Sequence, residues 1–498
     1  MSSLEKLSRR SFLGESACSA LGSTSIMSSL LSLKMANNAV AADLPTDSED
    51  RKTLVCLYLH GGIDSYNVLI PRDTERYADY ATTRTNLALP RESLLPLRQS
   101  VNGNGEDYAI HPAMGGLQEL FNGTGAVEGP RRLSFISNIG TLIEPMTKSE
   151  YKNRLKPRPR GLFSHSDQAE QWQTSLPQGD VDLTGWAGRV ADILHDQSNG
   201  GSKTSMSISL AGNNMFQVGR NTQQFVMTSR GALTFSQNSG TNHPTALKNL
   251  ALRSMMEQNY ANLMEKAFAE LTDKSIDQQE FIQGEFDALK EDFSGVVFPD
   301  SGIGRNLLAT LKTIALRAKL GLRRQTIFVS RGGWDHHSSL IQPQQDLLGE
   351  LTPALAAFQK GLENCGLADS VITFSASDFA RTLRSNGSGS DHAWGGNQFV
   401  MGGPVGGGQV LGQYPSLAFD SPDDVGRGGR ILPTTSVDAL VAELLLWFGL
   451  EGRSNFEQIL PNLSNFYDIR DAKPHDPSTL PIGFLKPCLL YTSPSPRD

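Results

Sequence analysis

Carboxylates and imidazoles follow apolar segments of this sequence at several separate points. The densest group is the segment 332–337, where Asp335, His336 and His337 come just after the apolar run 326–329. Imidazole and carboxylate groups together are the usual protein ligands of Zn²⁺, Mn²⁺ and Fe. Because the sequence has nine histidines in all, two adjacent ones beside an aspartate predict a metal site.

The segments around these residues predict alternating strands and helices. Apolar runs typical of buried strands occur at 53–59, 133–136, 326–329 and 371–374, and residues 205–210 alternate between polar and apolar as in a strand. Patterns typical of helices occur at 247–272, 275–293, 305–320, 345–364 and 437–449. Strands that alternate with helices predict an α/β fold with a largely parallel sheet covered on both faces. Because no repeat or long linker divides the sequence, we expect one elaborated domain.

Ionisable residues that follow different strands are expected to converge, because the carboxyl ends of parallel strands lie at the same edge of a sheet. The candidate ligands near such strand ends are Asp64, Asp335, His337, Asp378, Asp391 and His392. Several carboxylates in one cleft would repel one another without a cation. Two metal ions sharing these ligands would remove the repulsion and could clamp the attacking and leaving oxygens of a phosphoryl or sulfuryl displacement.

Each candidate ligand also has a purely structural interpretation. Asp64 follows two glycines and could cap a short helix. Asp378 could be a helix cap paired with Arg381, and Asp391 could be a turn residue. His336 and the histidine after it need not both point into a site. The shared position at strand ends, rather than any single motif, therefore favours a metal site.

The two ends of the sequence predict segments outside the domain. Residues 8–13 read Ser-Arg-Arg-Ser-Phe-Leu, a twin-arginine export pattern, and residues 39–41 read Ala-Val-Ala, a cleavage site. We therefore expect 1–41 to be a twin-arginine signal peptide, the export machinery to be a partner, and the mature protein to be periplasmic or secreted. Residues 488–498 resemble a translated sequencing adapter and are expected to be an artefact, which leaves 52–487 as a single domain.

Composition argues against several other classes of function. A net charge of −7 gives no electrostatic reason to bind nucleic acid or an anionic membrane. The weakly apolar stretch near the N-terminus contains Glu15 and many serines, so it is too polar for a stable membrane span. Between the two end segments there are two cysteines, and Cys56 is expected to be a buried thiol rather than the partner of Cys365. A nucleotide-dependent oxidoreductase is disfavoured, because no Gly-x-Gly-x-x-Gly pattern follows the first predicted strand.

The order of the motifs resembles that of the exported family called domain of unknown function 1501. The motifs are Gly-Gly-x-Asp at 61–64, Ser-His-x-x-Gln at 164–168, Gly-Gly-Trp-Asp-x-His at 332–337, Ser-Asp-Phe-x-Arg-Thr at 377–382 and Asp-His-x-Trp-Gly-Gly at 391–396. The resemblance runs from about residue 53 to about residue 460. That family is similar in fold to the alkaline phosphatase and sulfatase superfamily. The resemblance therefore implies an alkaline-phosphatase-like, three-layer α/β/α sandwich with a mostly parallel central sheet.

The resemblance also implies a metal-dependent hydrolase of phosphate or sulfate esters, on small molecules or on polymers. One or two divalent ions (Zn, Mn, Ca or Mg) would be held by the six candidate ligands named above. The best-placed hydroxyls for a nucleophile are Ser65 and Ser166, and Arg381 could bind a tetrahedral anion with two parallel hydrogen bonds or form a structural salt bridge. Because neither a sulfatase nor a phosphatase nucleophile motif is present, a non-catalytic exported binding or assembly protein with the same fold is the alternative.

Overall fold

The computed structural model describes residues 50–100, 103–123, 130–179, 184–200, 202, 204–232, 244–289, 292–426, 428–473 and 476–487. The segments expected to be a signal peptide (1–41) and a sequencing artefact (488–498) lie outside these residues. Within the described part of the chain, no helix combines the length and the apolar character that crossing a membrane requires.

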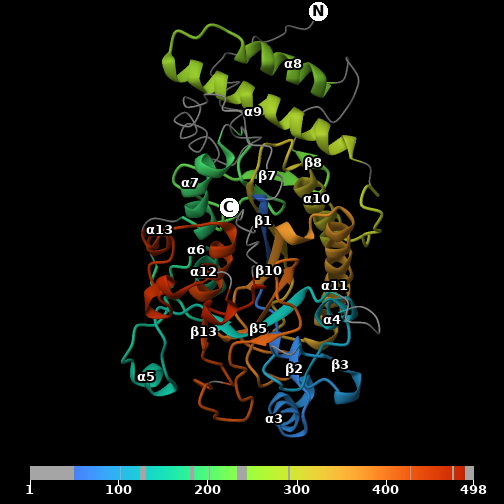
Figure 1. The fold of residues 1–498 in the computed structure, drawn as a ribbon, viewed down its shortest axis with the longest axis vertical. Coiled ribbons are helices and arrows are strands. Elements are labelled where there is room, and N and C mark those ends of the chain that lie inside the picture. The colour runs from blue at the N-terminus through green and yellow to red at the C-terminus, as the bar shows by residue number, and fades with distance from the viewer. Residues whose placement is uncertain are drawn as a thin grey trace, which may run out of the picture.

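A ten-stranded mixed sheet forms the centre of the structure, in the order β12-β5-β11-β10-β1-β9-β6-β7-β8 with β13 beside β5 (Figure 1). Its strands are β1 (Lys52–Leu59), β5 (Leu133–Gly140), β6 (Ser207–Ser209), β7 (Phe225–Thr228), β8 (Gly231–Ala232), β9 (Arg324–Arg331), β10 (Val371–Ser377), β11 (Gly396–Gly402), β12 (Val410–Leu411) and β13 (Thr435–Ser436). Strands β1, β6, β7, β9 and β10 are parallel, whereas β11 is antiparallel to both β10 and β5. A second, three-stranded sheet consists of β2 (Leu69–Pro71), β4 (Tyr108–Ile110) and β3 (Leu95–Pro96).

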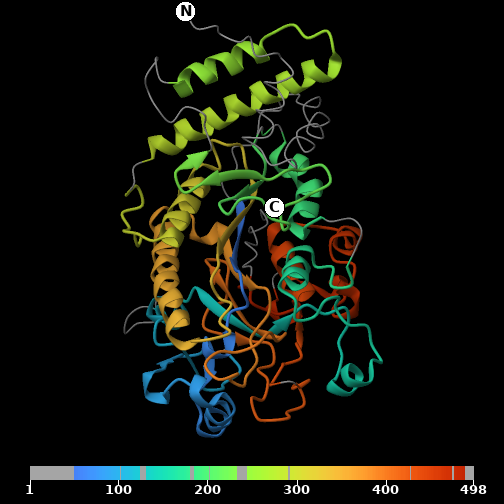
Figure 2. The same ribbon diagram turned by 180° about the vertical axis from the view of Figure 1, so that it is seen from behind.

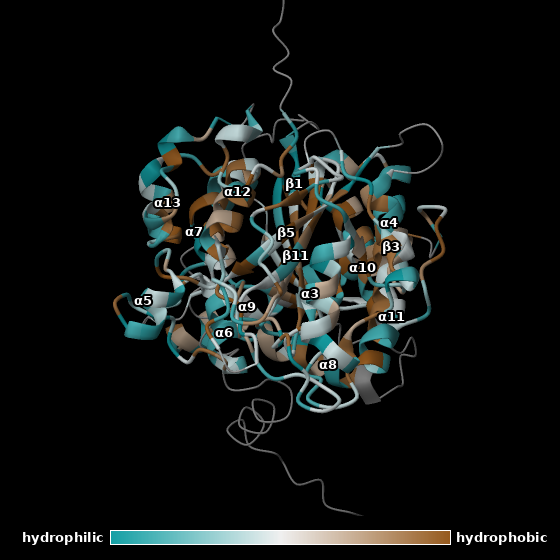
Figure 3. Ribbon diagram, turned by 90° about the horizontal axis from the view of Figure 1, so that it is seen from below, coloured by the Kyte–Doolittle hydropathy of each residue, from teal (hydrophilic) through white to brown (hydrophobic). Residues whose placement is uncertain are grey.

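Helices cover both faces of the large sheet and so form three layers (Figures 1 and 3). One face is covered by α4 (Gly115–Asn122), α10 (Gly302–Leu316) and α11 (Ile341–Asn364). The other is covered by α6 (His165–Thr174), α7 (Trp186–Asn199), α12 (Val437–Phe448) and α13 (Arg453–Ile459). The remaining α-helices described are α3 (Thr74–Arg84), α5 (Lys148–Asn153), α8 (Pro244–Met256) and α9 (Leu263–Ala288). The predicted α/β fold with a mostly parallel sheet is confirmed.

Burial explains why the central strands are apolar without alternation. Strand β1 has neighbours on both sides and helices on both faces, so Leu54, Val55 and Leu57 are fully buried. Figure 3 shows hydrophobic residues gathered on the central strands and the helix sides next to them, while the outlying α5 is hydrophilic. Cys56 is a buried free thiol, as predicted, and Cys365 is also free.

Short 3₁₀ helices connect several of these elements. They span Ser65–Asn67, Thr85–Leu87, Arg91–Ser93, Ala368–Ser370, Leu463–Asn465, Ile469–Asp471 and Pro477–Thr479. The first of them lies in the loop between β1 and β2.

The helices predicted over 247–272 and 275–293 have different bounds in the structure. Helix α8 ends at Met256, and α9 is a single helix that runs from Leu263 to Ala288. The Asn262 side chain accepts hydrogen bonds from the backbone N–H groups of Met264 and Glu265, and this cap fixes the start of α9. Figure 2 shows α8 and α9 at the end of the molecule farthest from α3.

Candidate metal centre

The carboxyl ends of β1, β9 and β10 lie side by side. The parallel register places Leu59 beside both Arg331 and Ser377. The residue that follows Leu59 is His60, and the residue that follows Ser377 is Asp378. Loops from three strands therefore begin at the same edge of the sheet, as the sequence pattern predicted.

Helix α6 adds a histidine to this edge from the covering layer. The helix begins at His165, and Ser164 caps it by accepting a hydrogen bond from the backbone N–H of Asp167. The Nδ1 atom of His165 lies 2.7 Å from Oδ2 of Asp378, and its Nε2 lies 3.3 Å from Oδ1 of Asp335. His165 was not among the predicted ligands, although it stands in the motif at 164–168.

Two further histidines approach the same carboxylate. The Nδ1 atom of His337 lies 2.9 Å from Oδ1 of Asp335, and Nε2 of His392 lies 3.5 Å from that oxygen. The ring centroid of His392 is 4.3 Å from that of His165 and 4.7 Å from that of His337. One ligand atom each from His165, Asp335 and His392 falls within 4.8 Å of the other two, which is a spacing that one metal ion can bridge.

Hydrogen bonds fix which nitrogen each histidine presents. The Nδ1 atom of His165 bonds to Asp378, and Nδ1 of His392 bonds to the backbone oxygen of Phe163 at 2.7 Å. The Nε2 atoms of both rings are buried and have no hydrogen-bond partner among the described residues. Because the carboxylate and the carbonyl accept from Nδ1–H, each ring in its neutral form has its lone pair on Nε2, the atom that faces Asp335.

The two carboxylates of the site differ in exposure. Asp335 keeps 47% of its side chain exposed, whereas Asp378 keeps 4%. Oδ2 of Asp378 also accepts a hydrogen bond from the backbone N–H of Gly61 at 3.0 Å. Asp335 is thus reachable from solvent, and Asp378 is a buried partner of His165 rather than the helix cap that the sequence allowed.

Charge and burial together determine the protonation of the site. Burial alone would raise the pKa of Asp335, but the hydrogen bond and the charge of Arg381 bring it below its ordinary value. The hydrogen bond to Asp378 raises the pKa of His165, against the opposite effect of burial. Burial lowers the pKa of His392. These shifts favour the ionised form of Asp335, make protonation of His165 easier and make protonation of His392 harder.

Arg381 holds the loops of the site together. Its guanidinium is fully buried and donates to the backbone oxygens of Gly61 at 2.6 Å, Gly62 at 2.8 Å and Ser390 at 3.0 Å, as well as to Oδ1 of Asp335. These bonds commit most of its donors to the protein, so the structure favours the structural role for this arginine over the binding of a tetrahedral anion.

Glycine is required where the loop after β1 passes the loop after β9. Gly61 has φ +115°, and a Cβ atom there would lie 2.6 Å from the backbone nitrogen of Asp335. The backbone oxygen of His60 also accepts from the N–H of Trp334 at 3.3 Å. The loop that carries Asp335 therefore rests directly on the backbone of Gly61.

The structure does not bring Asp64 or Asp391 into the group. Asp64 forms an ion pair with Arg84, and both side chains are fully buried. Asp391 is exposed, and its Oδ1 accepts a hydrogen bond from Nδ2 of Asn386 at 2.9 Å. The charge of Asp64 is thus neutralised by Arg84. The Asp391 side chain forms its hydrogen bond within its own turn. Both placements differ from the predicted metal ligation.

The two candidate hydroxyls form their hydrogen bonds with other residues than those of the histidine cluster. Oγ of Ser65 is buried and accepts a hydrogen bond from the backbone N–H of Asn397 at 2.9 Å. Ser166 is exposed on α6, and its hydroxyl lies 3.1 Å from that of Ser164. Neither contact places the oxygen against Asp335, so the structure gives no support to either serine as a nucleophile.

The geometry defines an α/β protein with a histidine and aspartate cluster at the carboxyl edge of its parallel strands. A family model described as "Protein of unknown function (DUF1501)" matches residues 51–456. The chain therefore belongs to that family, as the motif order indicated. No curated protein matched the sequence.

Proposed function

We propose that this protein is a metal-dependent hydrolase of phosphate or sulfate esters. One observation carries the proposal: two imidazoles, each held at Nδ1, direct unpartnered Nε2 atoms towards one half-exposed carboxylate. Histidine ligands of metal ions nearly always donate their other ring nitrogen to a carboxylate or a carbonyl. His165 has a carboxylate partner at Nδ1, and His392 has a backbone carbonyl partner at Nδ1.

His165, His392 and Asp335 would hold the ion. Three protein ligands with an open position are typical of catalytic zinc sites, and two imidazoles favour Zn or Mn over Ca or Mg. An ion bound there would act as a Lewis acid towards an ester oxygen and would lower the pKa of a bound water. The exposure of Asp335, 47%, gives a substrate access to that position.

The surrounding residues orient the ligands and supply an exchangeable proton site. Asp378 fixes the ring of His165, and Arg381 fixes the carboxylate of Asp335. His60 lies at the rim, 46% exposed, with Nδ1 4.0 Å from Oδ1 of Asp378. Burial lowers the pKa of His60, so at neutral pH its ring is neutral and able to accept a proton from water or return one to a leaving group.

The substrate class and the compartment rest on the sequence. The resemblance to the alkaline phosphatase and sulfatase superfamily supports phosphate or sulfate esters. The twin-arginine pattern at 8–13 supports export to the periplasm or beyond. Both belong to the proposal together with the metal.

Elemental analysis of purified protein tests the proposal most directly. We expect about one Zn or Mn per chain, and loss of that metal together with turnover of aryl phosphate or aryl sulfate in His392→Gln. Asp391→Asn is the matched control, because it removes the charge of the neighbouring carboxylate, which lies outside the cluster. Folded protein that takes up no divalent metal would refute the proposal.

A second function, a metal-binding protein without turnover, is supported by the placement of the serines. Ser65 is buried and bonded to the start of β11, and Ser166 is bonded to its own helix cap. This alternative predicts the same metal content with no rate on either ester. A rate that disappears in His392→Gln would exclude it.

A further inference from the structure

Strand β1 places Tyr58 behind the proposed metal centre. Tyr58 is in register with Ala376 on β10, and Asp378 comes two residues after Ala376. Alternate residues of neighbouring parallel strands share a face of the sheet, so Tyr58 and Asp378 lie on the same face, one step apart. His60 is next on that face, with its ring centroid 4.4 Å from that of Tyr58 and Nδ1 4.0 Å from Oδ1 of Asp378.

Two buried oxygens in this region lack hydrogen bonds. Tyr58 has no exposed surface, and its hydroxyl has no hydrogen-bond partner among the residues described. The same holds for Oδ1 of Asp378, although Oδ2 is fully used by His165 and Gly61. Buried polar atoms without partners cost about 1–3 kcal/mol each, so a neighbouring donor and acceptor of this kind call for an explanation.

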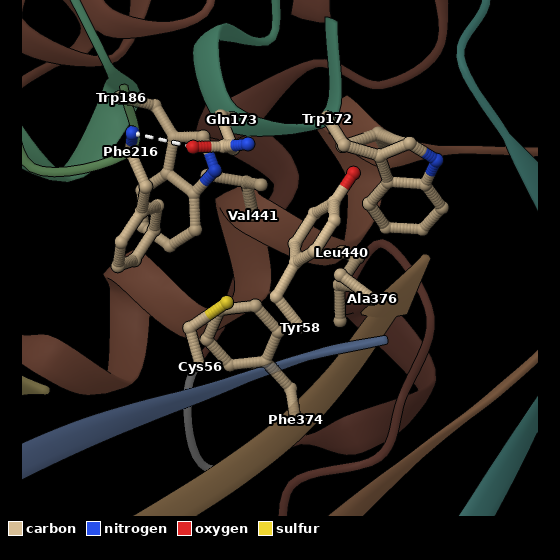
Figure 4. A pocket seen from close by; sticks show the side chains of 11 residues that line it. Cys56, Tyr58, Trp172, Gln173, Trp186, Phe216, Phe374, Ala376, Leu440 and Val441 are labelled. Atoms are coloured by element: carbon tan, nitrogen blue, oxygen red, sulfur yellow. Dashed lines mark hydrogen bonds between the residues drawn. The ribbon is translucent and has the colours of Figure 1, made fainter. Parts of the chain in front are cut away.

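A small cavity beside Tyr58 gives its hydroxyl room to turn. The cavity has a volume of about 10 Å³ and is lined by Tyr58, Trp172 and Gln173 among others (Figure 4). This is close to the space of one water molecule. Figure 4 shows the Tyr58 hydroxyl directed towards the side of the cavity formed by Trp172 and Gln173.

Gln173 connects the tyrosine to the helix that carries His165. Its side-chain oxygen accepts a hydrogen bond from the backbone N–H of Phe216 at 3.0 Å, which leaves its NH₂ group as the donor on the other side. Burial raises the pKa of Tyr58, the charge of Asp378 raises it further, and the neighbouring amide of Gln173 lowers it. Both side chains therefore lie close enough to the phenol oxygen to act on it.

We propose that Tyr58 is a positioning residue for the metal centre, whose hydroxyl donates to Oδ1 of Asp378 and thereby holds that carboxylate against Nδ1 of His165. The inference rests on the proposed function. A cation at Nε2 of His165 makes Nδ1–H a stronger donor, so the position of the Asp378 carboxylate matters most in the metal-bound protein. Gln173 donates to the phenol oxygen and leaves its O–H free for Asp378.

Tyr58→Phe tests this inference, because it removes the hydroxyl and keeps the ring. We measure Zn affinity by competition with a chromophoric chelator, and the midpoint of thermal unfolding in the metal-free protein. Loss of a partner behind a metal ligand weakens metal binding roughly 10–100-fold, and we expect that range here. The metal-free protein should also unfold at a lower temperature, because Oδ1 of Asp378 stays buried and loses its proposed donor.

Tyr66→Phe is the matched control. Tyr66 is equally buried, but its hydroxyl donates to the backbone oxygen of Gly395 at 3.1 Å. The control should therefore unfold at a lower temperature and bind Zn with unchanged affinity. A purely structural role for Tyr58 would give the same pattern as the control.

The outcomes separate this inference from the proposed function. Unchanged Zn affinity in Tyr58→Phe, or an equal loss in both variants, overturns the role of Tyr58 and leaves the metal centre in place. A wild-type protein that binds no Zn or Mn overturns both.

Discussion

Replacement of Asp64 by asparagine should destabilise the fold and leave the metal content unchanged. Asp64 and Arg84 form an ion pair in which neither side chain has exposed surface. Arg84 also donates to the backbone oxygen of Thr382 at 3.3 Å, so its charge remains inside the protein when its partner is neutralised. The cost of Asp64→Asn is therefore that of an uncompensated buried cation.

The expected magnitude is large for a single substitution. Removal of one partner from a buried ion pair costs about 3–5 kcal/mol. Proteins of ordinary stability unfold with a free energy of about 5–15 kcal/mol, so Asp64→Asn should remove a substantial part of the total. The midpoint of thermal unfolding should fall by several degrees or more.

The assay compares Asp64→Asn with His392→Gln. Thermal unfolding is followed by circular dichroism with a chelator present, because bound metal would itself stabilise the folded state. Metal content is measured separately by elemental analysis of the purified proteins. We expect Asp64→Asn to lower the midpoint and keep the metal, and His392→Gln, whose side chain is 22% exposed, to lose the metal with a small change in midpoint. Loss of metal from Asp64→Asn at an unchanged midpoint would refute the reasoning and restore Asp64 as a ligand.

Two further predictions concern the loop contact and the pH dependence of stability. Gly61→Ala should weaken metal binding and lower the free energy of unfolding by more than about 1–2 kcal/mol. The added Cβ would lie 2.6 Å from the backbone nitrogen of Asp335, and the backbone has φ +115° there. A normal Zn affinity in this variant would contradict the prediction. Burial raises the pKa of Asp438 to about 7 in the folded state, against 3.8 in the unfolded chain. The folded protein then holds an extra proton between pH 4 and 7, so this group destabilises it progressively as pH rises through that window, by an amount on the order of 4 kcal/mol. Asp438→Asn should unfold at a temperature that falls less steeply with pH than in the wild type, and parallel curves for the two proteins would count against the burial argument.

The strand ends of the candidate site were predictable from sequence, because they follow from a rule of parallel sheets. Apolar runs located β1, β9 and β10, and the register of these strands then places Asp335 and Asp378 at one edge. The fold class followed from the same alternation of strands and helices. The rule predicts which residues lie at the edge of the sheet, but it does not predict the direction of each side chain there.

Residues outside that rule were placed differently or missed. Asp64 stands five residues after the end of β1, and the cation that neutralises it comes from the far end of α3. His165 does not follow a strand at all, since it begins a helix of the covering layer. Local sequence carries no information on which helix passes over which strand end, so the pairing of Asp64 with Arg84 and of His165 with Asp378 could not be derived from it.

The motif at 377–382 has the widest effect on the site, because two of its residues each fix a ligand from another element. Asp378 is buried and holds His165, which comes from α6. Arg381, three residues later, is buried and holds Asp335, which comes from the loop after β9. The two carboxylates thus have different roles because their burial differs. Asp335 is half-exposed and available to a cation, whereas Asp378 is buried and orients an imidazole. A single turn after β10 therefore determines the position of two of the three proposed ligands.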